Sequence, residues 1–164
     1  FMVANVGPSA QVIKSLQRMN WDVPIVSHWG PAGGRFTELA GPWSEKVEMI
    51  QTFTFSGNDS PKAATMLEKL KKRFPEIKTA ADVTPAVGIA NAYDAMHLTA
   101  LAIKNAGSTK GPDIRKGFYA IDKHEGLIKT YEKPFTLEVH DALGPDDYVF
   151  TRFIKGEIIP ISRS

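Results

Sequence analysis

A glycine-rich loop that carries a histidine and a tryptophan is the first place in the sequence where chemistry could occur. The apolar run 23–26 predicts a short buried strand, and the stretch SHWGPAGG (27–34) follows it directly. A nucleotide-binding loop would need the pattern GxGxxG or GxxxxGKS/T, and Gly30, Gly33 and Gly34 match neither pattern. The loop is therefore not predicted to hold a phosphate group.

A serine hydrolase would need a serine and a histidine whose side chains face each other, with an acid behind the histidine. Ser27 lies next to His28, and Asp94 or Asp141 could supply the acid. Adjacent residues of an extended segment point to opposite sides, so Ser27 and His28 are not predicted to act as nucleophile and base. We therefore expect no catalytic residue, and an enzyme on an α/β sheet remains only a remote alternative.

Cysteine and histidine usage argues against a metal site. The chain has no cysteine, which excludes thiol catalysis, disulfides and cysteine-ligated zinc. The histidines lack any spacing typical of metal ligands, such as HxxxH. They are His28, His97, His124 and His140. We expect neither a bound metal nor a cofactor.

The loop can still line a pocket, because ligands of open α/β sheets bind beyond the carboxyl ends of the strands. Two such loops are visible, Asn5–Ser9 and Ser27–Gly34. Trp29 offers a flat apolar wall, and His28 offers a polar group beside it. From the residues alone two interpretations stay open, since Trp29 could equally cover the end of the sheet.

Length and composition are those of one ordinary soluble domain. The chain has 164 residues, of which 43% are hydrophobic and 23% charged, which excludes disorder and a coiled coil. Its 20 basic and 18 acidic residues are interspersed and give a net charge of +2, so nucleic-acid binding is not expected. No stretch approaches the roughly 20 apolar residues that span a bilayer. Phe1 opens within a predicted strand, so we expect further residues upstream.

The first third of the chain has a βαβ pattern. A strand is predicted over residues 1–6, followed by a helix with Ser9 as its N-cap. A strand at 23–26 and a short helix at 36–40 follow, and Gly41 is the predicted C-cap. An alternating strand is predicted over 47–55. The apolar face of the first helix is predicted to contain Ala10, Val12, Ile13, Leu16 and Met19.

Helices dominate the middle of the chain and strands its end. Ser60 and Pro61 predict the start of a helix with Ala64, Met66, Leu67, Leu70 and Phe74 directed toward a core. A long helix is predicted from Thr84-Pro85 to Asn105, and a shorter one over 112–121. Alanines of the long helix are predicted to pack closely against a sheet: Ala90, Ala92, Ala95, Ala100 and Ala102. Strands are predicted at 135–139, 148–154 and 157–161, the last two joined by a two-residue turn.

Taken in order, these segments resemble the end of the type I periplasmic solute-binding proteins that serve branched-chain amino acid ABC transporters. The resemblance covers essentially the whole chain and lies in a collinear series rather than in one motif. The series contains LQRMNWDVPIVS, the loop before FTELAG, VEMIQTFTFSGNDSP, NAYDAMHLTALAIKNAGS and YVFTRFIKGEIIPI.

The resemblance implies a three-layer α/β/α fold with a mostly parallel sheet, of which this chain is the C-terminal half. Residues 1–52 are expected to end the second of two lobes, and 53–147 to return to the first lobe. Residues 148–164 are expected to form a last crossing and a terminal hairpin. With the N-terminal half absent, sheet edges and apolar surface should be exposed, which favours a bound fragment or an oligomer.

The resemblance also implies positions for the ligand contacts. They fall on Asn5, Val6, Gly7, His28, Trp29, Gly30 and Gly88. Amino-acid binders of this family commonly have an acidic residue where this chain has Trp29, and it pairs with the ligand ammonium. A buried ammonium without a carboxylate is unfavourable by several kcal/mol, so an unmodified α-amino acid is disfavoured unless the missing N-terminal half supplies the acid. We therefore expect a ligand with a flat or apolar body, such as an aromatic carboxylate, stacked on Trp29 and oriented by His28 or Asn5.

The resemblance implies a function in transport without covalent chemistry. The protein would be the periplasmic or extracellular solute-binding component of an ABC importer, and it would deliver a small acid or amino acid to the permease subunits. Its other expected partner is the missing N-terminal half of its own chain. A sensor or regulatory domain on the same fold is the alternative.

Overall fold

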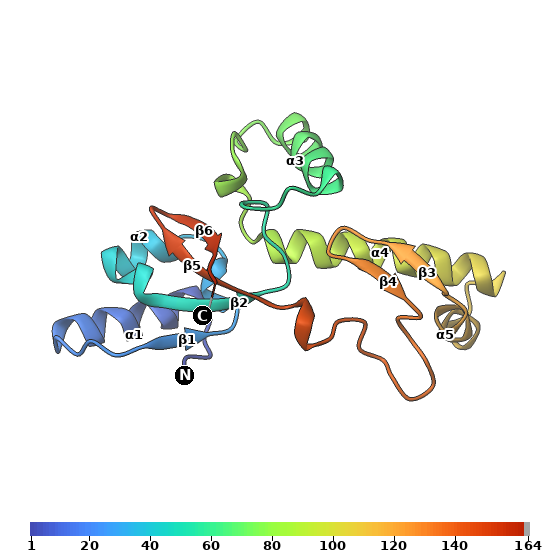
Figure 1. Cartoon of the computed structure of the whole chain (residues 1–164), viewed down its shortest axis with the longest axis horizontal. Helices are drawn as coiled ribbons and strands as arrows, with labels where there is room; N and C mark the ends of the chain where they lie inside the picture. Colours follow the sequence, from blue (N-terminus) through green and yellow to red (C-terminus); the bar gives the residue numbers. More distant parts are fainter. Residues whose placement is uncertain (163–164) are drawn as a thin grey trace. The chain divides into compact units, whose positions relative to one another are not determined.

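The computed structural model describes residues 1–162, which divide into two compact units (Figure 1). The first unit contains Phe1–Val87 and the chain from Tyr148 onward, and the second is Gly88–Asp147. The chain therefore leaves the first unit once and returns to it. The predicted lobe boundary at 147 coincides with this return, and the boundary predicted at 52 lies inside the first unit. The lobe assignment itself stays a prediction.

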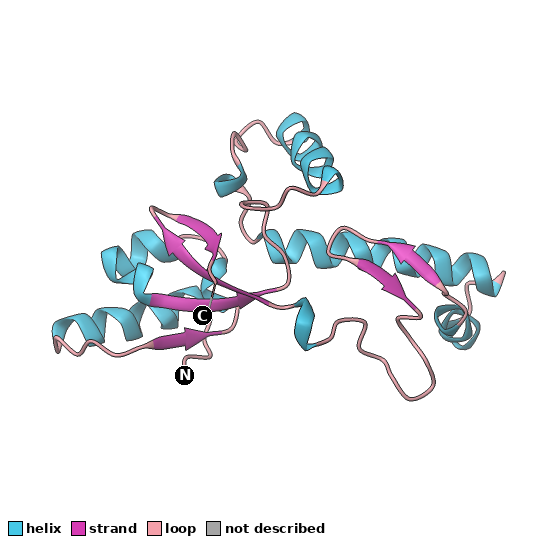
Figure 2. Cartoon of the chain, in the orientation of Figure 1, coloured by secondary structure: helices cyan, strands magenta, loops and turns pink. Residues whose placement is uncertain are grey.

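A four-stranded sheet forms the centre of the first unit (Figure 2). The strand order is β1-β2-β5-β6, so β1 and β6 are its edges. The strands are β1 (Ile25–Ser27), β2 (Val47–Gln51), β5 (Val149–Ile154) and β6 (Glu157–Pro160). The helical segments that precede β2 in the chain are α1 (Val6–Arg18), η1 (Gly30–Ala32), α2 (Phe36–Ala40) and η2 (Gly41–Lys46).

Strand direction changes across this sheet. β1 and β2 are parallel, with Ile25 opposite Val47, and Met2 adds a parallel bridge to Ser27. β5 and β6 are antiparallel to their neighbours. The α/β class is confirmed, and the sheet is mixed because the returning chain enters it as a hairpin. Parallel pairing is confined to the βαβ portion, where a helical crossover permits it.

The core of the first unit lies between the sheet and the helices α1 and α2. Alternate residues of β2 are buried, as the period-two pattern predicts. Gly41 closes α2 as predicted, at φ 72°, where its N–H bonds the Thr37 carbonyl. The buried cluster consists of Met2, Ala10, Ile13, Ile25, Ala32, Phe36, Ala40, Val47, Met49 and Phe153.

The N-terminal strand and the start of the first helix differ from prediction. Only Met2 pairs with the sheet, and α1 already begins at Val6 with Asn5 as N-cap. The first turn of a helix tolerates Pro8 because its missing N–H would have no intrahelical partner there. Ser9 is therefore not the cap; it is buried, and its hydroxyl donates to the Ala4 carbonyl at 2.9 Å. On the predicted apolar face, Val12 and Met19 are exposed.

The helix α3 (Pro61–Arg73) starts as predicted, since the Ser60 side chain accepts from the Ala63 N–H. The predicted apolar face is wrong in its extent: only Ala63 of this helix is buried, and Phe74 is exposed. Few elements of the described chain lie against this helix. A short turn, η3 (Ala80–Asp82), follows it with Thr79 and Asp82 in a reciprocal capping box.

The second unit is built on the predicted long helix, α4 (Ala86–Ala106), which Gly107 follows directly. The helix α5 (Gly111–Tyr119) is also confirmed within two residues. Two short strands that the sequence did not predict form a hairpin, β3 (Lys123–Glu125) and β4 (Thr130–Glu132). The predicted strand at 135–139 is wrong, because this segment forms bends and loop. A last turn is η4 (Pro145–Asp147).

The alanines of α4 have two different environments. Ala90 and Ala102 are fully buried, whereas Ala92, Ala95 and Ala100 are exposed. Within the described second unit, the neighbours of this helix are the helix α5, the hairpin β3–β4 and the segment after β4 (Figure 1). The predicted packing of all five alanines against a sheet is therefore wrong for the described chain.

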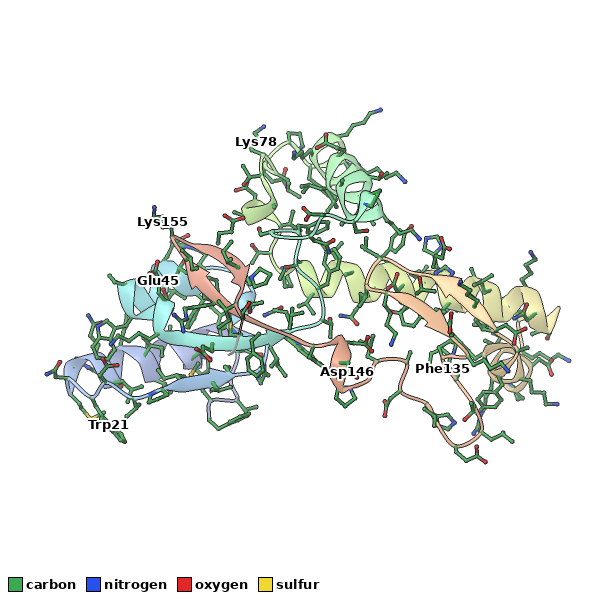
Figure 3. The ribbon with its side chains drawn as sticks, in the orientation of Figure 1. Trp21, Glu45, Lys78, Phe135, Asp146 and Lys155 are labelled. Carbon is green, nitrogen blue, oxygen red and sulfur yellow. The ribbon has the colours of Figure 1, made fainter. Side chains whose placement is uncertain are left out.

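The terminal hairpin β5–β6 is confirmed with its two-residue turn. Lys155 and Gly156 both have positive φ, 52° and 85°, as a tight turn with the native strand twist requires. The turn is held to η2, since the Lys155 N–H donates to Glu45 Oε1 at 2.7 Å; Figure 3 labels both residues. On β2 and β5, Arg152 pairs with Glu48 at 2.7 Å in register.

Candidate functional site

The loop after β1 takes its shape from the residues predicted to be functional. Gly30 donates its N–H to His28 Nδ1 at 2.5 Å, which folds the loop back on itself. The Trp29 carbonyl accepts from the Ala32 N–H at 2.9 Å and so starts η1. Because Nδ1 is an acceptor here, a neutral His28 carries its proton on Nε2, where it can donate to a ligand.

The other predicted loop is shorter than expected, because Val6 and Gly7 belong to the first turn of α1. Asn5 stands before this helix in an extended conformation, at φ −77° and ψ 176°. Its side chain makes no capping hydrogen bond, so the amide is not used to hold the helix end. The Asn5 amide can therefore donate a hydrogen bond to a ligand at the N-terminus of α1. The partial positive charge of a helix N-terminus favours an anionic group there.

The structure brings these two loops together. A methyl group placed on Gly33 or Gly34 would lie 3.9 or 4.0 Å from Val6 Cγ2, and one on Gly30 would collide with the Ala4 carbonyl. The cause is the pairing of Met2 with β1, since the Met2 N–H donates to the Val26 carbonyl at 2.9 Å. Parallel neighbours end at the same edge of a sheet, and the loops beyond them meet there.

An aromatic platform stands at this edge. The Trp29 ring lies parallel to that of Tyr148, with centroids 6.4 Å apart and planes 6° apart. The His28 ring meets Trp29 edge-on, at 6.3 Å and 68°. Trp29 is 42% exposed and Tyr148 is 37% exposed, so the platform keeps surface for a ligand. Tyr148 was missed in the sequence because it is distant in the chain; its place at the start of a strand after Gly144-Pro145 was the available signal.

Gly88, the remaining predicted contact, lies in the second unit. It is an exposed residue in the first turn of α4. The six residues of the two loops are thus assembled within the first unit, and Gly88 is not among them. Its part in the site stays a prediction.

Solved structures of bacterial binding proteins resemble the chain along nearly its whole length. The periplasmic binding protein type 1 of Bordetella pertussis Tohama I matches 97% of the chain with a TM-score of 0.79 and 19% identity. The LivJ substrate-binding protein of Streptococcus pneumoniae, solved with isoleucine, matches 97% with a TM-score of 0.68 and 19% identity. A solute-binding protein of R. palustris, solved with benzoate, matches 98% with a TM-score of 0.66 and 13% identity. The chain has the type I periplasmic binding protein fold.

Only part of that fold is present in the 164 residues. The chain spans 45%, 43% and 41% of the three proteins just named. No protein-family model and no curated protein sequence matches it. The expectation that the chain corresponds to part of a two-lobed type I protein agrees with this coverage.

Ser27 and His28 are not arranged as a nucleophile and its base. Ser27 is buried, and the His28 Nδ1 that could serve as a base is bonded to the Gly30 N–H. Within residues 1–162, no group of three or more His, Asp or Glu side chains is placed to hold a metal ion. None of the described helices is both long and apolar enough to cross a membrane. The polar groups at the platform are hydrogen-bond donors beside flat apolar surface.

Replacing Gly30 with alanine is expected to lower the free energy of unfolding by about 1 to 2 kcal/mol. The added methyl group would overlap the Ala4 carbonyl and the His28 imidazole, so the loop has to open. Gly7→Ala is the matched control, because a methyl group there meets nothing within 4 Å. Thermal unfolding followed by tryptophan fluorescence checks the difference. Equal stability of the two variants would contradict the close contact between the loops.

Proposed function

We propose that the protein is the solute-binding component of an ABC importer. The observation that supports this proposal is structural similarity to a periplasmic binding protein, which covers 97% of the chain with a TM-score of 0.79. Two further structures of the same fold are named as transporter proteins and were solved with small ligands, isoleucine in one and benzoate in the other. The proposed activity is capture and release of a small solute, with no covalent step and no cofactor.

The proposed cellular location and partner follow from the same structural similarity. The protein works in the periplasm or at the outer cell surface and delivers its solute to the membrane subunits of a permease. Because the chain spans less than half of its structural neighbours, a complementary N-terminal half completes the second wall of the site. Closure of two lobes on a ligand is a hinge motion that binding stabilises.

The proposed ligand is a small carboxylate with a flat apolar body. The stacked rings of Trp29 and Tyr148 favour a flat group, and a second offset ring adds to such a stack. The donors on His28 and Asn5 suit a carboxylate. Neither FMVANVGPS (1–9) nor SHWGPAGG (27–34) contains an acidic residue. An ammonium group would therefore lack a partner on these loops, which disfavours an α-amino acid.

Calorimetric titration of the chain with benzoate and with leucine tests this proposal. Benzoate is expected to bind, and leucine is expected to bind at least about tenfold more weakly because its ammonium is unpaired. Trp29→Ala should weaken benzoate binding about tenfold through the loss of the stack. Trp21→Ala is the control, since Trp21 is 58% exposed and lies outside the two loops. Tight binding of leucine together with no binding of benzoate would contradict the proposed ligand class.

A further inference from the structure

A second aromatic depression lies in the second unit, within residues 88–147. It is open to solvent and has a volume of about 350 Å³ between the helix α5 and the segment that follows β4. Figure 3 labels one of its residues, Phe135, near α5. Its lining consists of Arg115, Phe118, Tyr119, Phe135 and His140. The volume is within the range of roughly 300 to 1,000 Å³ that small-molecule sites occupy.

Four rings in two pairs form the walls of this depression. Phe118 and Phe135 meet edge-to-face, with centroids 5.2 Å apart and planes at 80°. Tyr119 and His140 are stacked, at 6.0 Å and 12°. Phe118 and Phe135 also pack on the core of the second unit, so their positions are fixed by the fold. The Phe118–Phe135 wall is therefore a preformed apolar surface that fits a flat hydrocarbon group.

The polar groups of the depression are joined in one chain of hydrogen bonds. Arg115 Nε donates to Tyr119 Oη at 2.7 Å, and Tyr119 Oη lies 3.2 Å from His140 Nε2. The Arg115 guanidinium also lies 5.9 Å from the centre of the Tyr119 ring. These contacts hold the cation at the rim of the depression and leave its Nη groups as donors.

Charge selects the ligand class. Arg115 forms no ion pair with any residue in the described chain, 1–162, and no acidic residue lines the depression. A cationic ligand would be repelled, and an inorganic anion would leave the apolar walls unused. A planar carboxylate suits both parts, since guanidinium binds carboxylates in a bidentate geometry. We propose that this depression is a second binding site, which takes a small aromatic carboxylate on Arg115.

Fluorine NMR of the chain labelled with 3-fluorotyrosine tests this site separately from the Trp29 platform. The chain has four tyrosines, of which Tyr119 reports on the depression and Tyr148 on the platform. Single Tyr→Phe variants assign the signals. Titration with benzoate is expected to move the Tyr119 signal until it saturates. Benzyl alcohol, a neutral molecule of similar shape, should bind about tenfold more weakly.

The variant Arg115→Gln is expected to raise the benzoate midpoint of the Tyr119 signal about tenfold. Arg73→Gln is the matched control, because Arg73 also lies over a ring, that of Phe74, on an exposed helix end. A Tyr119 signal that stays fixed while Tyr148 moves would overturn the second site and leave the proposed function standing. The reverse pattern would support the second site and count against the platform. Equal midpoints for Arg115→Gln and Arg73→Gln would also overturn the assignment.

Discussion

Replacing Asp94 with alanine is expected to lower the free energy of unfolding of the second unit by about 3 to 5 kcal/mol. Asp94 is 2% exposed on α4 and holds the hairpin β3–β4. Its carboxylate accepts from the N–H groups of Leu127 at 2.5 Å and Ile128 at 2.9 Å, and from the Tyr131 hydroxyl at 2.9 Å. Removal of the carboxylate leaves these donors without their acceptor.

The ionisation of Tyr131 supports this arrangement. Burial raises the pKa of the Tyr131 hydroxyl, and the hydrogen bond to Asp94 and its negative charge raise it further. The hydroxyl therefore keeps its proton across the physiological pH range and remains a donor to the carboxylate. Gly126 lies against the same group, because a methyl group there would be 2.7 Å from Asp94 Oδ2.

Hydrogen exchange localises the effect of Asp94→Ala. Amides of residues 123–132 should exchange faster, whereas those of the sheet strand 47–51 should keep their protection. Asp146→Ala is the control, because Asp146 is an exposed acid of the same unit (Figure 3). Unchanged exchange of 123–132 in Asp94→Ala, relative to this control, would mean that the carboxylate does not hold the hairpin.

Replacing Gly117 with alanine is expected to lower the free energy of unfolding by about 2 to 3 kcal/mol. A methyl group on Gly117 would overlap the carbonyl of Ala102, where α5 crosses α4. The nearest atoms belong to the backbone, so no side chain can turn away and the helices have to separate. The gain in helix propensity, about 1 kcal/mol, is smaller than this effect.

The matched control for Gly117→Ala is Gly111→Ala in the same helix. Gly111 begins α5, and a methyl group there meets nothing within 4 Å. Urea unfolding followed by circular dichroism should place Gly111→Ala within about 0.5 kcal/mol of the parent chain. A Gly117→Ala variant as stable as Gly111→Ala would rule out the close crossing of α4 and α5.

Local signals in the sequence predicted most of the helices. The caps at Ser60 and Gly41 act within one turn, and they mark the start of α3 and the end of α2 as expected. The two-residue turn at Lys155-Gly156 also depends on adjacent residues alone. These features were predictable because the physical causes lie within a few residues of their effects.

Features that depend on distant residues were missed. The strands β3 and β4 are three residues each, and their end residues are exposed, so the alternation in each is too short to be recognised as a strand. They exist because Asp94, 33 residues before Leu127, binds the connection between them. Periodicity also predicted that the α3 face would be buried, but burial needs a neighbouring element that the pattern does not contain.

The candidate site was predicted only in part, because some of its residues are linked by local order in the chain and others only by contacts between distant segments. The order of strand and loop placed residues 5–7 and 28–30 at one sheet edge, and the structure brings them together through the pairing of Met2 with β1. Tyr148, which stacks on Trp29, comes 119 positions after it in the sequence (148 − 29), and no local pattern links the two rings.

The most direct test of the central claim is fluorine NMR of the chain labelled with 5-fluorotryptophan, during a titration with benzoate. The three tryptophans, Trp21, Trp29 and Trp43, give separate signals that single Trp→Phe variants assign. If the platform binds the solute, the Trp29 signal moves in a saturable way while those of Trp21 and Trp43 stay in place. A Trp29 signal that does not respond to benzoate or to leucine would contradict solute binding at this edge of the sheet.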